Sequence, residues 1–344
     1  MQNNLAPETS VSFPAVIYRP PCSEAKYELQ LSENACLVHS STAEVFTLEF
    51  KITENRISLH CRSSQARPES LGYLVGIEHL LGQYSEVTEI VLLSSDPVLE
   101  QTLESFKTEG GAYFLLRSEF YQLPFLWLAK KPSHVLTERW TESHGRSHPV
   151  RPKPFDGTAY SRLFPQIQKT LSFRRVDLSR DLDLFHNWHN QARVSEFWEL
   201  NQSKEQLREY LNKQLNDAHQ SPWIVEADGK PVAYFELYYT PEDRLGPYYD
   251  YEAHDRGFHF LIGDRSFLGL KNTDAVIKSA LHFLFLDDPR TRNVMAEPRS
   301  DNTKILRYVE VFPAWKKLKE FDFPHKRAAL LECRRERFFQ GTHL

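Results

Sequence analysis

The sequence has no basic surplus, no long apolar run and no sign of a leader segment. Its formal net charge is −4 at pH 7, whereas a general nucleic-acid binder normally has an excess of Lys and Arg. No stretch approaches the roughly 20 apolar residues that a membrane helix needs, and residues 1–21 lack a basic segment followed by an apolar one. We therefore expect a cytoplasmic protein that binds neither nucleic acid nor a membrane.

Metal ligands in a recognisable spacing are also missing. The cysteines are scattered and form no C-x-x-C pair, so the sequence predicts reduced thiols and neither a zinc site nor a disulfide framework. His186 and His189 lie three residues apart on a predicted helix, which is a spacing that can bind a metal. No third ligand follows nearby, and we therefore expect no metal.

The length and the composition are those of a globular protein with two domains. The 344 residues are enough for two hydrophobic cores, and 41% of them are hydrophobic and 13% aromatic. Prolines cluster between residues 131 and 155, which indicates a connecting segment. We expect an N-terminal α/β domain over residues 1–130, a Pro-rich linker over 131–165 and a second domain over 166–344.

Patterns of apolar residues predict an α/β fold in which helices flank a mixed sheet. Residues 1–40 look irregular because prolines interrupt them. In the first domain we expect strands at 45–51, 56–60, 89–93 and 112–116 and helices at 69–81 and 97–106. In the second we expect strands at 171–176, 223–227 and 232–239, and helices at 181–190 and 204–218, with Ser203 capping the last.

Residues 255–325 carry the polar residues on which a site can be built. The pattern is a strand at 255–263, a loop, a helix from about 273 to 286, a strand at 293–297 and a short helix. His259 lies on the first strand and Asp301 follows the second, so the two strands can bring these side chains together. A core histidine and a helix N-cap are the alternative roles of these two residues.

The two halves of the chain are weakly similar to each other. Residues 90–96 lead into the helix at 97–106 in the way that residues 294–301 lead into the helix that follows them. One interpretation is an internal repeat whose first copy is a degenerate one without polar site residues. Chance similarity between two α/β units is the other.

The second half resembles the siderophore-biosynthesis branch of the GNAT superfamily of N-acetyltransferases, over roughly residues 150–340. The strings that carry the resemblance are FWE at 197–199, YFELY at 234–238, EDRLG at 242–246, DRGFH at 255–259, DDPRT at 287–291, EPRSDN at 297–302 and KEFDFPHK at 319–326. This branch contains aerobactin-type N6-hydroxylysine acetyltransferases and alcaligin- and desferrioxamine-type N-hydroxydiamine acyltransferases. The resemblance implies the GNAT acyl-CoA N-acyltransferase fold in this half and transfer of an acyl group to an N-hydroxylated amine, which gives a hydroxamate.

Binding of a coenzyme A thioester needs N–H donors at a helix N-terminus for the diphosphate and a donor for the oxyanion. The loop at 263–273 lies between a strand and a helix and matches the family's glycine loop in part. In the family a backbone N–H binds the oxyanion at the point where two parallel strands separate. Asn302 of this chain is placed to bond the pantetheine amides. The predicted cofactor-binding residues are Phe260, Leu261, Ile262, Arg265, Gly269, Leu270, Lys271, Asn272, Thr273 and Asn302.

The attacking nitrogen must be neutral, and an N-hydroxylated amine is much less basic than the lysine amine. The enzyme therefore needs only to orient the nitrogen and to remove one proton during the attack. His259 is the predicted base because the ordinary pKa of histidine lies near neutrality. Asp301 is predicted to orient the imidazole or to bind the hydroxyl group of the substrate.

The acceptor carries a distal ammonium, and also a carboxylate if it is an amino acid. We expect Glu236 to bind the ammonium, because it interrupts an aromatic strand where a charge is otherwise costly, and Arg244 to bind a carboxylate. The full predicted substrate-binding set is Trp198, Glu236, Tyr238, Arg244 and Asp255. Core packing for Trp198 and surface positions for the charged residues are the alternatives.

Three questions stay open at this point. The donor is acetyl-CoA by first choice and succinyl-CoA by second, and the acceptor is N6-hydroxylysine, N-hydroxyputrescine or N-hydroxycadaverine. An N-hydroxylating monooxygenase and a siderophore synthetase are the expected pathway neighbours. The alternative functions are acetyl transfer to an ordinary small amine and non-catalytic binding of coenzyme A.

Overall fold

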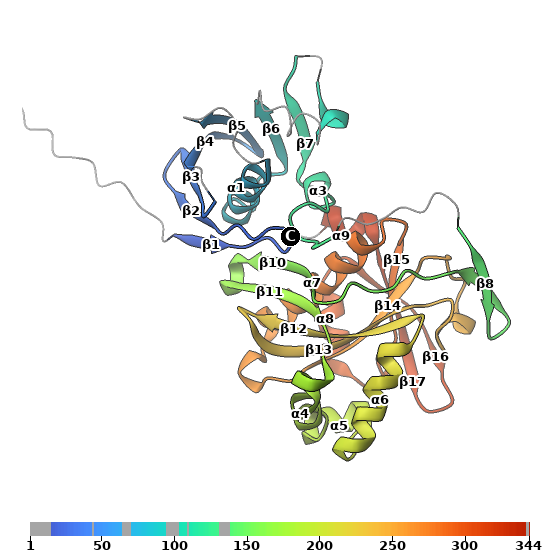
Figure 1. Ribbon diagram of the computed structural model, residues 1–344. Coiled ribbons are helices and arrows are strands. Elements are labelled where there is room, and N and C mark those ends of the chain that lie inside the picture. Colours follow the sequence, from blue (N-terminus) through green and yellow to red (C-terminus); the bar gives the residue numbers. More distant parts are fainter. Residues whose placement is uncertain are drawn as a thin grey trace, which may run out of the picture. The chain divides into compact units, whose positions relative to one another are not determined.

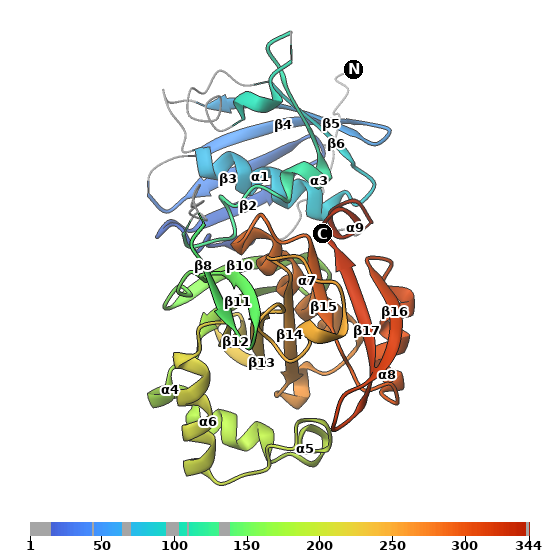
Figure 2. The same ribbon diagram turned by 90° about the vertical axis from the view of Figure 1, so that its right-hand side faces the viewer.

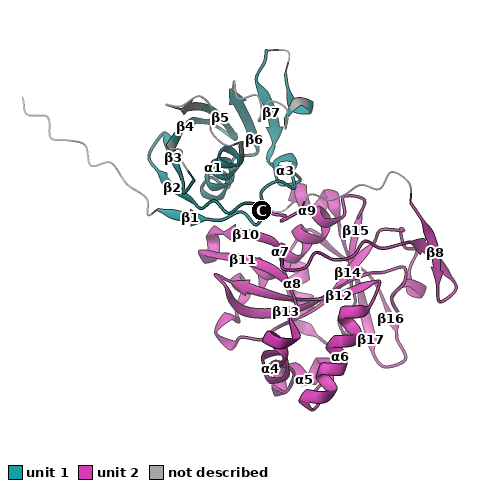
Figure 3. Cartoon of the chain, in the orientation of Figure 1, with its two compact units in different colours: residues 1–126 teal, residues 127–344 magenta. Residues whose placement is uncertain are grey.

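The computed structural model describes residues 15–42, 45–63, 70–93, 103–108, 110–130, 138–341 and 344. The chain divides into two compact units, Met1–Leu126 and Trp127–Leu344 (Figure 3). Each unit is built around its own mixed sheet (Figure 1).

Unit 1 contains a sheet whose strands follow one another in chain order from β1 to β7. The strands are β1 (Val16–Tyr18), β2 (Tyr27–Leu31), β3 (Ala35–Ser40), β4 (Val45–Thr53), β5 (Arg56–Ser63), β6 (Glu89–Leu93) and β7 (Tyr113–Leu116). Helix α1 (Ser70–Gln83) connects β5 to β6, which are parallel, and the other neighbouring strands are antiparallel. A 3-10 turn at Glu104–Phe106 and the short helix α3 (Arg117–Phe120) complete the unit.

The expectation that residues 1–40 are irregular is wrong for the part that the structure describes. β1, β2 and β3 occupy most of residues 16–40. In β2 the side chains of Tyr27, Leu29 and Leu31 are buried and the two between them are exposed, which is the alternation of a half-buried strand. The prolines lie before this strand and do not interrupt it. Most of the helix expected at 97–106 lies outside the described residues.

Unit 2 contains an eight-stranded sheet in the order β10-β11-β12-β13-β14-β15-β17-β16 (Figure 2). The strands are β10 (Thr158–Phe164), β11 (Lys169–Arg175), β12 (Gln220–Ala227), β13 (Lys230–Tyr239), β14 (Arg256–Ile262), β15 (Asn293–Ala296), β16 (Trp315–Asp322) and β17 (Arg327–Arg334). Only β14 and β15 are parallel neighbours. The turn between β12 and β13 has positive φ at Asp228 and Gly229, as a two-residue hairpin requires.

Regular structure also occurs in the stretch that we expect to be a linker. A separate hairpin consists of β8 (Trp140–Ser143) and β9 (Arg146–Pro149), and β10 is the edge strand of the large sheet. The compact second unit accordingly begins at Trp127.

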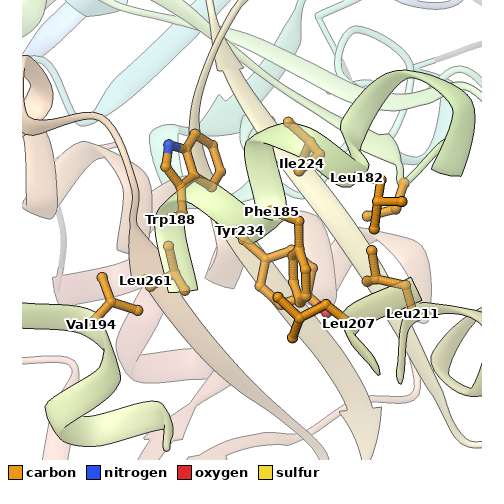
Figure 4. Close-up of a cluster of buried hydrophobic side chains, with 10 residues drawn as sticks. Leu182, Phe185, Trp188, Val194, Leu207, Leu211, Ile224, Tyr234 and Leu261 are labelled. Atoms are coloured by element: carbon orange, nitrogen blue, oxygen red, sulfur yellow. The ribbon is translucent and has the colours of Figure 1, made fainter. Parts of the chain in front are cut away.

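Helices cover both faces of the second sheet. They are α4 (Leu178–His189), α5 (Ala192–Trp198), α6 (Lys204–Asn216), α7 (Leu270–Asp287), α8 (Thr303–Val311) and α9 (Arg335–Gly341). Helices α4 and α6 pack on one face through a cluster that includes Phe185, Leu211 and Tyr234 (Figure 4). On the other face Phe283 of α7 contacts Phe173, whose ring lies 5.3 Å from that of Phe235.

Strand alternation sets which side chains of β13 and β14 share a face. Tyr234 and Leu261 belong to the cluster under α4 and α6, so Glu236 and His259, two positions away on the same strands, lie on that face as well. Ser203 caps α6 in a capping box with Gln206, as predicted for Ser203. These anchored helices cover the face on which the candidate site lies.

The parallel strands β14 and β15 separate soon after they begin. Their pairing consists of Arg256 with Val294 and Gly257 with Met295. In unit 1 the corresponding parallel strands β5 and β6 stay paired from Arg56 to His60. The two units thus share an order of five antiparallel strands, a helical crossover to a strand parallel to the fifth, and then an antiparallel strand, while the separation belongs to unit 2. The internal repeat stays a prediction.

Candidate active site

The backbone of β14 has an open edge where β15 leaves it. Gly263 N–H donates to Val232 and Thr240 N–H donates to Asp255, so the odd-numbered residues of β14 face β13. Because backbone groups alternate along a strand, the N–H and C=O of Phe260 face the side that β15 has left. This is where a thioester carbonyl can find a backbone donor, within the stretch 260–262 that the sequence indicates.

A cavity of about 950 Å³ opens at this edge. It is lined by eight of the residues singled out in the sequence, namely Trp198, Glu236, Arg244, His259, Phe260, Leu261, Ile262 and Asn302. Apolar residues of α7, α8 and β16, including Ile277, Tyr308 and Trp315, line it as well. A long, partly apolar ligand such as a pantetheine arm fits a cavity of this size and composition.

His259 lies between two buried carboxylates. Its Nε2 is 2.8 Å from Oε1 of Glu297, and its Nδ1 is 3.3 Å from Oε2 of Glu236. The side chain of His259 is 23% exposed, whereas those of Glu236 and Glu297 are 5% and 1% exposed. The imidazole therefore faces the cavity while its carboxylate partners are shielded from water.

The two carboxylates are themselves held by tyrosines. Glu236 accepts hydrogen bonds from Tyr210 at 2.5 Å and from Tyr234 at 3.0 Å. Glu297 accepts one from Tyr238 at 2.9 Å. A carboxylate that receives several hydrogen bonds can stay ionised when it is buried, and these contacts restrict both carboxylates in orientation.

The environment of His259 changes its protonation. Burial by itself lowers the pKa of His259, but the charges and hydrogen bonds of Glu297 and Glu236 outweigh it and raise the pKa to about 10. Burial raises the pKa of Glu297, but the neighbouring His259, Lys326 and Arg244 outweigh it and lower the pKa. At neutral pH the site thus contains an imidazolium between two carboxylates.

Two further cations stand beside Glu297. Arg244 Nη2 lies 3.4 Å from Glu297 Oε1 and 3.4 Å from His259 Nε2. Lys326 Nζ donates to the backbone oxygen of Glu297 at 2.7 Å and lies 3.6 Å from its carboxylate. The side chain of Arg244 is 49% exposed, so it keeps donors that can reach a ligand.

Asp301 does not contact His259. Its carboxylate receives both hydrogen bonds of Arg299, at 2.9 and 2.7 Å, and its side chain is 65% exposed. The expected contact between Asp301 and the imidazole is therefore absent, and Glu297 occupies the position that we expected Asp301 to have. Asn302, and not Asp301, is the N-cap of α8, and it accepts from Ile305 N–H while it lines the cavity.

The glycine loop precedes α7 as the sequence indicates, and the helix begins earlier than expected. Gly269 is the N-cap, with φ of 134°, a backbone conformation that favours glycine, and α7 starts at Leu270. The first-turn amides at Leu270, Lys271 and Asn272 have no carbonyl of their own helix to bond. The loop from Arg265 to Thr273 does not line the cavity, except through Leu268.

Two residues of the predicted substrate-binding set lie outside the cavity lining. Tyr238 is buried behind Glu297, to which it donates its hydrogen bond. Asp255 is buried and accepts from Tyr249, Asn293 and the Glu252 amide. Its burial raises the pKa of Asp255 to about 6. In the structure both residues support neighbouring protein groups.

Several site residues escaped the sequence reasoning. Glu297 lies in the EPRSDN string but gave no separate signal, because a Glu at the end of a strand is normally a surface residue. Tyr210 looked like part of the apolar face of α6. Arg193 of α5 donates to the carbonyls of Ile262 and Gly263 at 2.6 and 2.7 Å, next to the open edge of β14. Nothing in the local sequence reveals these long-range contacts.

Metal and membrane sites are not found in the part of the chain that the structure describes. Among these residues there is no group of three or more His, Cys, Asp and Glu side chains that could hold a metal ion. Nor does any helix of this part have the length and apolar character that crossing a membrane takes.

Burial lowers the pKa of His189 to about 4, although the Phe185 carbonyl and Glu236 oppose it, so this histidine is neutral.

A mixed sheet whose parallel central strands separate beside a polar cluster defines a protein of the acyl-CoA N-acyltransferase class. Residues 177–323 match the family described as the acetyltransferase (GNAT) domain. A Schizosaccharomyces pombe protein named as a candidate lysine N-acyltransferase is 38% identical over 73% of this chain and 76% of its own. The chain belongs to the GNAT acetyltransferase family and is an acyltransferase whose co-substrate is an acyl-coenzyme A.

Two more relatives carry names that include a hydroxylated amine. The N(6)-hydroxylysine O-acetyltransferase of Escherichia coli is 38% identical over 66% of this chain and 72% of its own. The N(5)-hydroxyornithine:cis-anhydromevalonyl coenzyme A-N(5)-transacylase of Beauveria bassiana is 45% identical over 56% of this chain, which covers 43% of that protein. Among solved structures, an uncharacterized Bacillus halodurans protein is 28% identical, with a TM-score of 0.50 over 54% of this chain and 97% of its own.

Proposed function

We propose that this protein transfers an acetyl group from acetyl-CoA to the hydroxylated nitrogen of an N-hydroxy amino acid, which gives a hydroxamate for a siderophore. The observation that carries the proposal is the position of His259, between two buried carboxylates at the open edge of β14. Such an arrangement serves an attack on a thioester, in which one proton leaves the nucleophile as the new N–C bond forms. The relatives named for hydroxylysine and hydroxyornithine support the acceptor class.

The protonated histidine changes the chemistry that the sequence indicates. An imidazolium has no free electron pair with which to take the proton of the nucleophile. Glu236, His259 and Glu297 together have a net charge of −1, with two carboxylates and one imidazolium, so the trio can accept one proton as a unit. We propose that it accepts the proton from the nitrogen and that the imidazolium supplies a proton to the departing thiolate.

An N-hydroxylated acceptor suits this weakly basic unit. A lysine-like amine is protonated at neutral pH and first needs a strong base, whereas a hydroxylamine nitrogen is already neutral. Glu236 and Glu297 are poor bases here because hydrogen bonds and cations hold them in the ionised form. The weak basicity of the site is therefore an argument for the hydroxylated substrate over an ordinary amine.

The cations beside the trio favour an acceptor that carries a carboxylate. The buried carboxylates Glu236 and Glu297 are already paired with His259, and Arg244 and Lys326 add further positive charge. An incoming ammonium would therefore displace a cation of the protein, whereas an incoming carboxylate is attracted by this positive charge. We accordingly place N6-hydroxylysine and N5-hydroxyornithine before N-hydroxycadaverine and N-hydroxyputrescine.

The test is a panel of acceptors and donors. Each N-hydroxy amino acid, its decarboxylated analogue and the parent amine is incubated with acetyl-CoA or succinyl-CoA, and released thiol and product mass are measured. We expect thiol release with the hydroxylated acceptors and acetyl-CoA, and a product that forms a coloured ferric complex, because an N-acylated product is a hydroxamate. An O-acylated product would give the mass without the complex.

The other outcomes decide against the proposal. Equal rates with hydroxylated and parent amines would indicate an acetyltransferase of ordinary amines. Binding of acetyl-CoA without thiol release from any acceptor would indicate a non-catalytic protein. A faster reaction with succinyl-CoA would change the donor and leave the acceptor chemistry in place. In the proposed pathway an N-hydroxylating monooxygenase supplies the acceptor and a siderophore synthetase consumes the product.

A further inference from the structure

The β8–β9 hairpin adds a cation to the cavity from outside the segment that matches the family. Arg146, the first residue of β9, lines the cavity with His144 of the hairpin turn, whereas the family match begins at residue 177. The turn residues His144 and Gly145 both have positive φ, as a tight two-residue hairpin turn requires. The hairpin thus presents Arg146 in a defined position.

Arg146 is held in place without being neutralised. Its Nη1 donates to the backbone oxygen of Asp243 at 3.1 Å and its Nη2 to that of Glu242 at 3.3 Å. Its Nε is buried and has no hydrogen-bond partner. No ion pair to Arg146 occurs within residues 15–341 so far as they are described. Each of the two donated bonds leaves a second N–H on the same nitrogen.

The backbone near Arg146 is shaped to admit its guanidinium. A Cβ atom at Gly246 would lie 2.3 Å from Nη1 of Arg146 and 2.8 Å from the Thr240 carbonyl oxygen. Any side chain at this position would therefore push the guanidinium out of its place. The absence of a side chain at Gly246 allows the close approach between the hairpin and this loop.

The carboxylates around Arg146 are engaged by other groups of the protein. Glu242 receives two hydrogen bonds from Arg151, at 2.5 and 2.7 Å, and lies 2.9 Å from His148 Nδ1. Asp243 accepts the Leu245 amide and lies 3.8 Å from His219. Arg146 is therefore a cavity-lining cation that an anionic ligand can neutralise. Such binding is favourable because a partly buried charge without a counterion is costly.

We propose that Arg146 binds the α-carboxylate of the amino-acid acceptor and so makes the hairpin a determinant of acceptor specificity. This inference rests on the proposed function, since it concerns the acceptor of that reaction. A guanidinium that keeps undonated N–H groups can bind a carboxylate, the anion that arginine recognises best. Arg244 then remains beside Glu297 and His259.

The test compares acceptors that differ only in the carboxylate. We measure kcat/KM of the wild type and of Arg146→Gln for N6-hydroxylysine against N-hydroxycadaverine, and for N5-hydroxyornithine against N-hydroxyputrescine. We expect Arg146→Gln to lower kcat/KM for the amino acids about 10–100-fold, mainly through KM, and to change that for the diamines less than about 3-fold. Arg139→Gln, an exposed arginine just before β8, is the matched control and should behave as wild type.

A substrate-side measurement keeps the test valid if the variant folds poorly. The methyl ester of N6-hydroxylysine lacks the carboxylate charge, so the wild type should use it about 10–100-fold less efficiently than the free acid. The kcat/KM of Arg146→Lys for the free acid should lie between those of the wild type and of Arg146→Gln. Equal losses on amino acids and diamines, or an ester used as well as the acid, would overturn the role of Arg146. If no acceptor yields product with any variant or the wild type, the proposed function itself fails.

Discussion

The Nε2 atom of His259 lies 2.8 Å from Oε1 of Glu297, a carboxylate whose side chain is 1% exposed. A buried carboxylate at hydrogen-bond distance strongly favours the charged imidazole, because in a medium of low polarity their attraction is large. The pair therefore determines which protonation state of the histidine meets the substrate. It also joins β14 to the end of β15, the two strands whose separation forms the cavity.

The first prediction is that His259 stays protonated far above the ordinary pKa of histidine. The ring resonances should titrate near pH 10 in an NMR experiment, because the pKa is raised to about 10. Glu297→Gln should move this titration to lower pH, since it removes the larger of the two carboxylate effects. A wild-type titration near pH 6.5 would contradict the geometry described for the site.

The same shift predicts how stability depends on pH. The folded-state pKa of His259 is above the unfolded value of 6.5, so its contribution is fully present below about pH 6.5 and is lost as pH rises toward 10. The free energy of unfolding of the wild type should therefore fall more steeply between pH 7 and 10 than that of His259→Gln. Urea unfolding at several pH values measures this difference, and parallel curves would argue against it.

The second prediction concerns turnover. His259→Ala should lower kcat by about 10²–10⁴-fold, the usual contribution of a positioned proton-transfer group, while the Kd for coenzyme A changes little. Calorimetric titration gives the Kd and thiol release gives kcat. A variant with wild-type turnover would remove His259 from the chemistry, and a large loss of coenzyme A affinity would make its role structural.

The third prediction separates two acidic residues that follow the same strand. Glu297 contacts the imidazole, whereas Asp301 is exposed and paired with Arg299. We expect Glu297→Gln to lower kcat about 10²-fold and to lower the pKa of His259, and Asp301→Asn to leave both nearly unchanged. Should Asp301→Asn have the larger effect on kcat, the interpretation that Asp301 orients the catalytic group would be restored.

The fourth prediction distinguishes two roles of Glu236. As an ammonium ligand it would mainly affect the KM of the acceptor, which is what the sequence alone suggests. Its carboxylate is occupied by Tyr210, Tyr234 and His259, so we expect Glu236→Gln to lower kcat and to change the acceptor KM little. Steady-state kinetics with a saturating donor separate the two. A raised KM with normal kcat would show that the carboxylate reaches the substrate after all.

The fifth prediction concerns the support of Glu297. A Cβ atom at Gly257 would lie 2.4 Å from the ring of Tyr238, whose hydroxyl bonds Glu297. Gly257→Ala should therefore destabilise the fold by about 1–3 kcal/mol and reduce kcat. Tyr238→Phe removes only the hydrogen bond and serves as the control, with normal packing and a smaller loss of kcat. A fully active, stable Gly257→Ala protein would contradict this close contact.

Local patterns were sufficient for much of the fold and for part of the site. The strand at 232–239 and the cap at Ser203 each depend on neighbours a few residues away, and the structure contains both as predicted. The strands of residues 16–40 were missed because the prolines before them outweighed a short alternation. The helix before β15 was predicted because its apolar spacing extends over several turns, although it begins at Leu270, before the expected residue 273.

What the sequence determined by itself is the family, the order of the main strands and helices of the second unit, and the presence of His259 on a strand that leads into a glycine-containing loop. Which acid pairs with this histidine depends on the register between β13, β14 and β15, and side chains 23 and 38 residues away in the chain meet it only after the sheet has formed. Asp301 and Glu297 are four residues apart, yet one faces solvent and the other is buried against the imidazole. Only the tertiary structure decides this, because burial and hydrogen bonding depend on the packing of the sheet and not on residue type.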